Sequence, residues 1–248
     1  MEQALHTARQ TNEAARSAAP AARADDAPRR RHDIYAGIHK ALRAALADTL
    51  VAVGRLDTGD PQESAQTLAA LRDVLAFCRD HLETENAFVH PAMEARRPGS
   101  TRRIADEHVG HAAAIASLAA QANALLQAPH GRRDALAAAL YGAFAHFVGE
   151  NLVHMHEEET VHNPVLWADY SDEELCALED AIRAHHPAPA MARALRWMLP
   201  ALPPAERAAM LAHARAKAPE AVYAGMLSLA RAHVDAAGLR KLDAALAA

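Results

Sequence analysis

Apolar residues recur every three or four positions over four long stretches of the chain, a spacing that places them on one face of a helix. In the second stretch they fall at Leu71, Leu75, Cys78 and Leu82. The four stretches predict helices over about residues 33–53, 61–91, 101–126 and 133–167.

Short turn sequences separate these predicted helices. Residues 58–61 read Thr-Gly-Asp-Pro, residues 98–100 read Pro-Gly-Ser and residues 129–131 read Pro-His-Gly. Short connections join antiparallel neighbours, so the predicted fold is all-α, an antiparallel up-down-up-down four-helix bundle. We expect Pro91 to kink or end the second helix, because proline removes a hydrogen-bond donor, and the segment after it to fold aside.

The two ends of the chain differ from this pattern. Residues 1–30 contain Ala, Arg and small polar residues without an apolar stripe, which predicts a disordered tail. Ser171 and Glu174 have the spacing of a helix-capping box and open a second helical region. Prolines cut this region into short helices, at Pro187, Pro189, Pro200, Pro203 and Pro204. The predicted divisions are a tail at 1–30, the bundle at 31–170 and a C-terminal helical extension of unknown role at 171–248.

Composition agrees with a helical protein. Hydrophobic residues make up 51% of the chain but aromatic residues only 4%, so Ala and Leu, both strong helix formers, must fill the core. No apolar run approaches the roughly 20 residues of a transmembrane helix. No apolar signal segment opens the chain, so we expect no membrane partner and a cytoplasmic location. Cys78 and Cys176 lie outside any CxxC pattern, which argues against a thiolate metal site.

Histidine is unusually frequent, with 16 residues in the chain. Residues 31–170 carry 18 acidic and 12 basic side chains, a net charge of −6, whereas the whole chain has −5. An acidic stretch rich in histidine suits a bound cation. It offers no basic face, so we do not expect nucleic acid as a partner.

Two of the predicted helices carry the same short motif. The second helix reads His81-Leu-Glu-Thr-Glu85 and the fourth reads His154-Met-His-Glu-Glu158, and in both a proline follows the His by ten residues. Residues i and i+4 lie on one helix face about 5–6 Å apart, so an imidazole and a carboxylate can reach one metal ion, or the carboxylate can bridge two. We interpret the repeat as two halves of a metal site.

Further ligands must come from the other two helices. Counted from the turns, His39 and His108 lie at roughly the depth of the motifs on their neighbours. Two alternatives stay open: His111 could replace His108, and His146 with Glu150 could replace the fourth-helix motif, because they repeat its spacing.

Three neighbouring residues have predicted secondary roles. We expect His90 and His162 to cap the end of the cluster or to face solvent, and Tyr35 to belong to the core or to hydrogen-bond near the metals. Imidazole and carboxylate ligands without thiolate suit iron or manganese, with zinc as a further option.

The candidate ligands follow a fixed order along the chain: His39, His81-x3-Glu85, His108 and His154-x3-Glu158. Over roughly residues 32–168 this order resembles the bacterial hemerythrin-like, HHE cation-binding family. The resemblance implies two non-haem iron ions held by four histidines and two bridging carboxylates, with zinc or manganese as substitutes. It also implies a small diatomic or peroxide ligand, that is, binding, sensing or reduction of O2, peroxide or nitric oxide.

The sequence departs from oxygen-carrying hemerythrins at two places. Their second third-helix histidine comes four residues after the first, where this chain has Ala112, with His111 one position earlier. Their last carboxylate is an Asp five residues after its His, whereas Glu158 comes at four. The resemblance therefore implies one histidine fewer and favours peroxide or redox chemistry over reversible oxygen carriage. An alternative is a metal-stabilised regulatory module whose C-terminal helices bind a protein partner.

Overall fold

A computed structural model describes residues 31–247, and of these residues 32–247 belong to one compact unit. Every regular element in the described part of the chain is a helix, which confirms the all-α prediction. The predicted tail at 1–30 lies outside the described residues.

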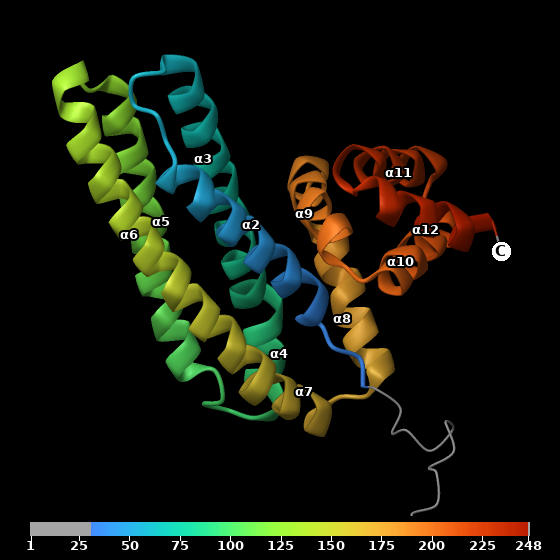
Figure 1. The fold of residues 1–248 in the computed structure, drawn as a ribbon. Helices are drawn as coiled ribbons and strands as arrows, with labels where there is room; N and C mark the ends of the chain where they lie inside the picture. Colours follow the sequence, from blue (N-terminus) through green and yellow to red (C-terminus); the bar gives the residue numbers. More distant parts are fainter. Residues whose placement is uncertain (1–30, 248) are drawn as a thin grey trace, which may run out of the picture. The chain divides into compact units, whose positions relative to one another are not determined.

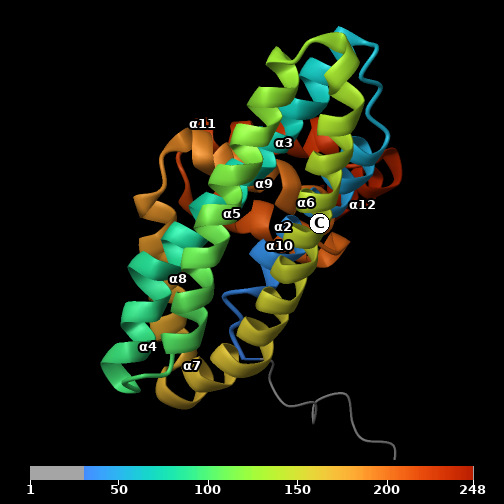
Figure 2. The same ribbon diagram turned by 90° about the vertical axis from the view of Figure 1, so that its left-hand side faces the viewer.

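Four long helices pack into a ring (Figures 1 and 2): α2 (Ala36–Gly54), α3 (Pro61–Thr84), α5 (Arg102–Gln127) and α6 (His130–Glu157). α2 contacts α3 and α6, and α5 contacts the same two helices. We call these helices and their extensions to Tyr170 the four-helix region. Its core is made by the apolar faces read from the sequence, with Leu71, Leu75, Phe144 and Phe147 almost fully buried.

The second and fourth helices each contain a π-helical turn. In α3 it is η2 (Glu85–Val89), followed by α4 (His90–Arg96), and in α6 it is η3 (Glu158–His162), followed by α7 (Asn163–Asp169). In both, the amide five residues after the Glu donates to the Glu carbonyl. A proline without an N–H stands two residues after the end of each wide turn, so the changed register accommodates the missing donor.

Of the two effects expected of Pro91, to kink or to end the second helix, the end is therefore wrong, and the next segment does not leave the helix. The chain stays helical up to Arg96, because the π-turn takes up the proline. Other boundaries agree to within three residues. α2 begins at Ala36 rather than 33, with the Asp33 carboxylate accepting from the Tyr35 and Ala36 amides. α6 begins at His130 rather than 133.

Five shorter helices complete the described chain: α8 (Asp172–His185), α9 (Ala188–Ala201), α10 (Pro204–Lys217), α11 (Glu220–His233) and α12 (Ala236–Ala247). We call them the C-terminal helices. Ser171 and Glu174 form the predicted capping box. α9 packs against α2 and α3, and its other neighbour is α11. A separate small core, containing Leu199 and Leu211, holds α9–α12 together, whereas Leu175 of α8 packs with Val89 and Leu166 of the four-helix region.

The expectation that no stretch resembles a membrane-spanning helix needs correction. α5 and the helical segment His130–Asp169 are long and apolar enough to cross a membrane, by length and composition alone. Both are alanine-rich, and both carry buried histidines, His108 and His154, that face the interior of the four-helix region. The core helices of soluble bundles pass the same test, so this finding is weak evidence for a membrane.

Candidate metal centre

The two π-turns place two carboxylates at the centre of the four-helix region. Glu85 is 2% exposed and Glu158 is fully buried. Burial raises the pKa of Glu85 well above its usual range, and the charge of Glu158 adds to this effect. Burial opposes ionisation of Glu158 as well, but the imidazoles of His108, His154 and His39 outweigh it and hold its pKa well below the usual range. A buried acid pair with such different environments is a strong candidate for cation binding.

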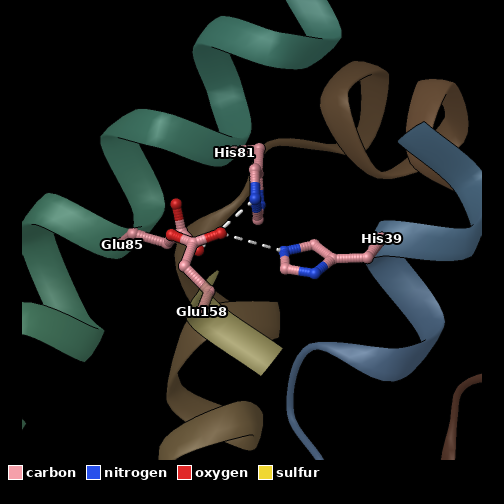
Figure 3. A group of neighbouring side chains, drawn as sticks. All are labelled: His39, His81, Glu85 and Glu158. Atoms are coloured by element: carbon pink, nitrogen blue, oxygen red, sulfur yellow. Dashed lines mark ion pairs between the residues drawn. The ribbon is translucent and has the colours of Figure 1, made fainter. Parts of the chain in front are cut away.

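A first cluster joins His39, His81, Glu85 and Glu158 (Figure 3). One ligand atom from each lies within 4.8 Å of all the others. Nε2 of His39 is 3.4 Å from Glu158 Oε2, and Nε2 of His81 is 3.3 Å from Glu85 Oε1. Two helices, α2 and α3, and the two π-turns thus supply one ligand atom each to a single point.

A second cluster uses the same two carboxylates with His108 and His154. Nε2 of His154 is 3.2 Å from Glu158 Oε1, and Nε2 of His108 is 3.6 Å from Glu85 Oε2. Because Glu85 and Glu158 belong to both clusters, they can bridge two cations. The structure therefore brings together all six residues singled out from the sequence.

The distances within the clusters fit a metal ion. Two ligand atoms each about 2.1 Å from a first-row cation, at angles of about 90–110°, are roughly 3.0–3.4 Å apart. The His–Glu separations of 3.2–3.4 Å fall in this range. They exceed the roughly 2.7–2.9 Å of a charge-assisted hydrogen bond. Ligand-side atoms of His39, His81, Glu85 and Glu158 are buried without a hydrogen-bond partner among the described residues, as expected of metal ligands.

Hydrogen bonds on the outer side of three imidazoles orient them toward the centre. Nδ1 of His108 lies 2.8 Å from Asn86 Oδ1, and Nδ1 of His154 lies 2.9 Å from Glu107 Oε2. Assigning the Nδ1 proton to these acceptors leaves each Nε2 as the lone-pair end of a neutral ring. The two Nε2 atoms are 3.1 Å apart, and two lone pairs at that distance repel unless a proton or a cation lies between them.

Glu159 plays the same part for His39, whose Nδ1 is 3.0 Å from Glu159 Oε1. Arg43 holds this carboxylate in place with two hydrogen bonds. Sequence reasoning missed these partners. The available signal was adjacency, because Asn86, Glu107 and Glu159 each stand next to a candidate ligand in the chain.

Of the two roles expected of His90 and His162, to cap the end of the cluster or to face solvent, the second is wrong, because the two residues are only 6% and 2% exposed. The wide π-turns carry both rings into the interior, where they form a third group with Glu158. The ring of His90 stacks on that of His108 at 4.8 Å between centroids. Burial lowers the pKa of both His90 and His162, so both are neutral and able to act as ligands at pH 7.

The alternatives left open by the sequence are now separated. The side chains of His146 and Glu150 are 74% and 48% exposed, so this pair is a surface repeat of the motif. His111 is buried with its ring 4.7 Å from that of His154, but it belongs to none of the three groups. His108 is the third-helix residue that reaches the carboxylates.

Helices that gather imidazoles and carboxylates around one buried centre define a class of cation-binding helical proteins. A family model of the hemerythrin HHE cation-binding domain matches residues 31–166, more than half of the chain. The chain belongs to this family, which confirms the resemblance seen in the sequence. No curated protein matches the chain. The described His and Glu clusters lie within the matched cation-binding domain.

Proposed function

We propose that α2, α3, α5 and α6 form an antiparallel up-down-up-down bundle that holds two iron ions, and that the protein binds, senses or reduces O2, peroxide or nitric oxide. The observation that carries the proposal is the sharing of Glu85 and Glu158 between two four-ligand clusters. Two carboxylates common to two sets of imidazoles are suited to bridging a pair of cations. The nitrogen and oxygen ligand set, without thiolate, favours iron, with manganese or zinc as substitutes.

A small pocket beside the clusters supports a ligand of diatomic size. It has a volume of about 10 Å³, close to the space that one water molecule needs. Apolar side chains, including Leu42, Leu82 and Ile115, line it together with the candidate ligands. Such walls exclude bulk water from the centre.

The iron pair would supply redox equivalents and open coordination positions to the small ligand. His111 lines the same pocket, and burial lowers its pKa to about 4, so its ring is neutral at pH 7. A neutral imidazole carries one N–H, which can donate a hydrogen bond to a ligand in the pocket. The outer partners of the other histidines fix their orientation without occupying this space.

Metal analysis and rapid mixing test the proposal. The full chain is expressed in iron-replete medium, its iron content is measured, and the reduced protein is mixed with O2, peroxide or nitric oxide in a stopped-flow spectrometer. We expect two iron ions per chain and an absorbance change with at least one of the three. Fewer than one metal ion per chain, or no spectral response to any of the three, would overturn it.

The division of the chain and its location remain proposals as well. We propose that residues 171–248 are an extension to the metal-binding bundle and that the protein is cytoplasmic. The free cysteines Cys78 and Cys176 agree with a reducing compartment. Trp197 and Met198 already pack against the core of the four-helix region, which speaks against a free docking face there for a protein partner.

A further inference from the structure

A second, much larger cavity lies between the four-helix region and the C-terminal helices. Its volume is about 830 Å³, and residues of α2, α3, η2 and α8–α11 line it. Pockets that bind organic molecules usually enclose about 300–1,000 Å³. A diatomic or peroxide ligand is far smaller, so the ligand proposed for the metal centre does not account for this space. We call it the side cavity.

The walls of the side cavity are aliphatic and flexible. Four of the seven methionines in the chain line it: Met191, Met198, Met210 and Met226. Methionine side chains adapt to ligands without a fixed shape. Among the lining residues that the structure describes, only Phe77 and Tyr35 carry a six-membered aromatic ring. Flexible aliphatic walls with few flat rings favour an extended hydrocarbon chain over a planar ring system.

Most polar groups at the rim are already engaged within the protein. His186 hydrogen-bonds Thr84, Arg183 pairs with Glu179, and Asp80 pairs with Arg193. These interactions satisfy the groups contributed by α8 and by the end of α3.

The α10 side of the rim differs. His213 and Lys217 lie one turn apart on α10, both are exposed, and neither has a carboxylate partner among the described residues. They leave the ammonium group of Lys217 and the imidazole of His213 at the edge of an apolar cavity. This combination is complementary to an apolar molecule with an anionic end.

The wall on the other side of the cavity belongs to the metal centre. His81 and Glu85 line the side cavity as well as the first metal cluster. The rings of His39, His108 and His154 each have a hydrogen-bond partner on their outer side. Among the described residues the His81 ring has no such partner, so this ligand borders the cavity directly. Tyr35 also lines the cavity, and its hydroxyl group is buried without a partner in the described chain.

We propose that the side cavity binds a single-chain aliphatic carboxylate, with its hydrocarbon chain among the methionines and its carboxylate at Lys217. Binding places the molecule against His81 and Glu85, while the energy of binding comes from the apolar walls and from Lys217. Occupancy therefore does not require iron, and the inference stands apart from the redox function proposed above.

Methyl NMR of the full chain, loaded with zinc so that resonances stay sharp, tests this inference with dodecanoate as the probe. Methionine methyl groups labelled with carbon-13 report directly on the cavity. We expect dodecanoate to shift the signals of Met191, Met198, Met210 and Met226. Met155, which is 2% exposed inside the four-helix region and does not line the cavity, serves as the internal reference. Absence of shifts at the cavity methionines, or equal shifts at Met155, would overturn the proposal.

Two pairs of variants test the position of the ligand. Val222 is 50% exposed and lines the cavity, so Val222→Trp should fill its edge and weaken dodecanoate binding at least ten-fold. Val109→Trp, at a 73% exposed position on α5, should have no effect. Lys217→Gln should weaken binding several-fold, whereas Lys241→Gln, on an exposed part of α12, should not.

The uncharged analogue dodecanol isolates the role of the charge. Dodecanol should bind to the wild type more weakly than dodecanoate does. The affinity of dodecanol should be the same for the Lys217→Gln variant as for the wild type. Equal affinity of the two probes for the wild type, or unchanged dodecanoate binding in Val222→Trp, would refute the assignment. The zinc content of each variant is measured in parallel, so a collapsed metal centre is distinguished from a blocked cavity.

Discussion

Replacing the shared carboxylate Glu158 by glutamine should weaken both bound cations at once. Glu158 belongs to all three groups of candidate ligands, and its side chain is fully buried. Structural zinc bound by four ligands in small domains contributes about 10–16 kcal/mol, or roughly 2.5–4 kcal/mol per ligand if shared equally, and we take this as the scale. At 1.4 kcal/mol per factor of ten, the variant should lose about 10²–10³-fold in affinity for each cation.

The loss should also appear as reduced stability of the metal-loaded protein. A ligand present at 100 times its dissociation constant stabilises the folded state by about 2.7 kcal/mol, and a 100-fold weaker site loses most of this. Thermal unfolding with and without metal should therefore show a smaller metal-induced rise in Tm for Glu158→Gln than for the wild type. Glutamine preserves the size of the side chain, so the fold is retained.

The surface repeat of the motif supplies a matched control. Glu150 stands four residues after His146 just as Glu158 stands four residues after His154, but its side chain is 48% exposed. Glu150→Gln should leave metal content and Tm unchanged. Competition titration against a chelator, with metal analysis, measures both variants. Wild-type affinity in Glu158→Gln, or an equal loss in Glu150→Gln, would show that the buried carboxylate does not bridge the cations.

Three further predictions follow from the same geometry. Glu107→Gln should lower the affinity for the cation of the second cluster by about 10–100-fold, because the outer partner of a ligand imidazole tunes its basicity. Calorimetric titration measures this affinity, and an unchanged value would show that the Glu107–His154 contact does not affect metal binding. Burial lowers the pKa of His90 and His111 in the folded protein to about 4. As the pH falls, these two histidines therefore take up protons in the unfolded chain before they do so in the folded protein. The stability of the metal-free protein should therefore decline from about pH 6.5 towards pH 4, and constant urea midpoints across that range would contradict this. Arg207→Met should destabilise the packing of α9–α12, because the buried carbonyl groups of Leu199 and Leu202 lose their hydrogen-bond donor. Each unsatisfied carbonyl group costs about 1–3 kcal/mol of stability. Hydrogen exchange should rise in α9–α12 with metal content retained, while Arg215→Met, at an exposed site, should change neither.

Much of the fold was predictable because it depends on local spacing. The apolar face of α3, including Leu71 and Leu75, repeats with the helical period, so the helix and its buried side were evident from the sequence. The motifs His81–Glu85 and His154–Glu158 are likewise local, because residues four apart share a helix face whatever surrounds them.

The sequence favoured His154 over His146 only through the proline ten residues later, since both histidines precede a glutamate by four residues. The separation depends on which side of α6 meets the other helices, and packing buries His154 while leaving His146 exposed. The sequence also left open whether His90 caps the end of the cluster or faces solvent. A π-turn inserts one residue into the helical register, and no spacing rule based on regular α-helix accounts for that shift.

The sequence by itself determined the helices, their apolar faces and the two imidazole–carboxylate pairs, because each depends on residues within a few positions of one another. Only the tertiary structure decided that Glu85 and Glu158 are shared by two clusters, that Glu107 orients His154, and that the C-terminal helices enclose a cavity beside the centre. These features join residues from different helices, often far apart in the chain. Their distances are fixed by how the helices pack around a common core, which no local pattern encodes.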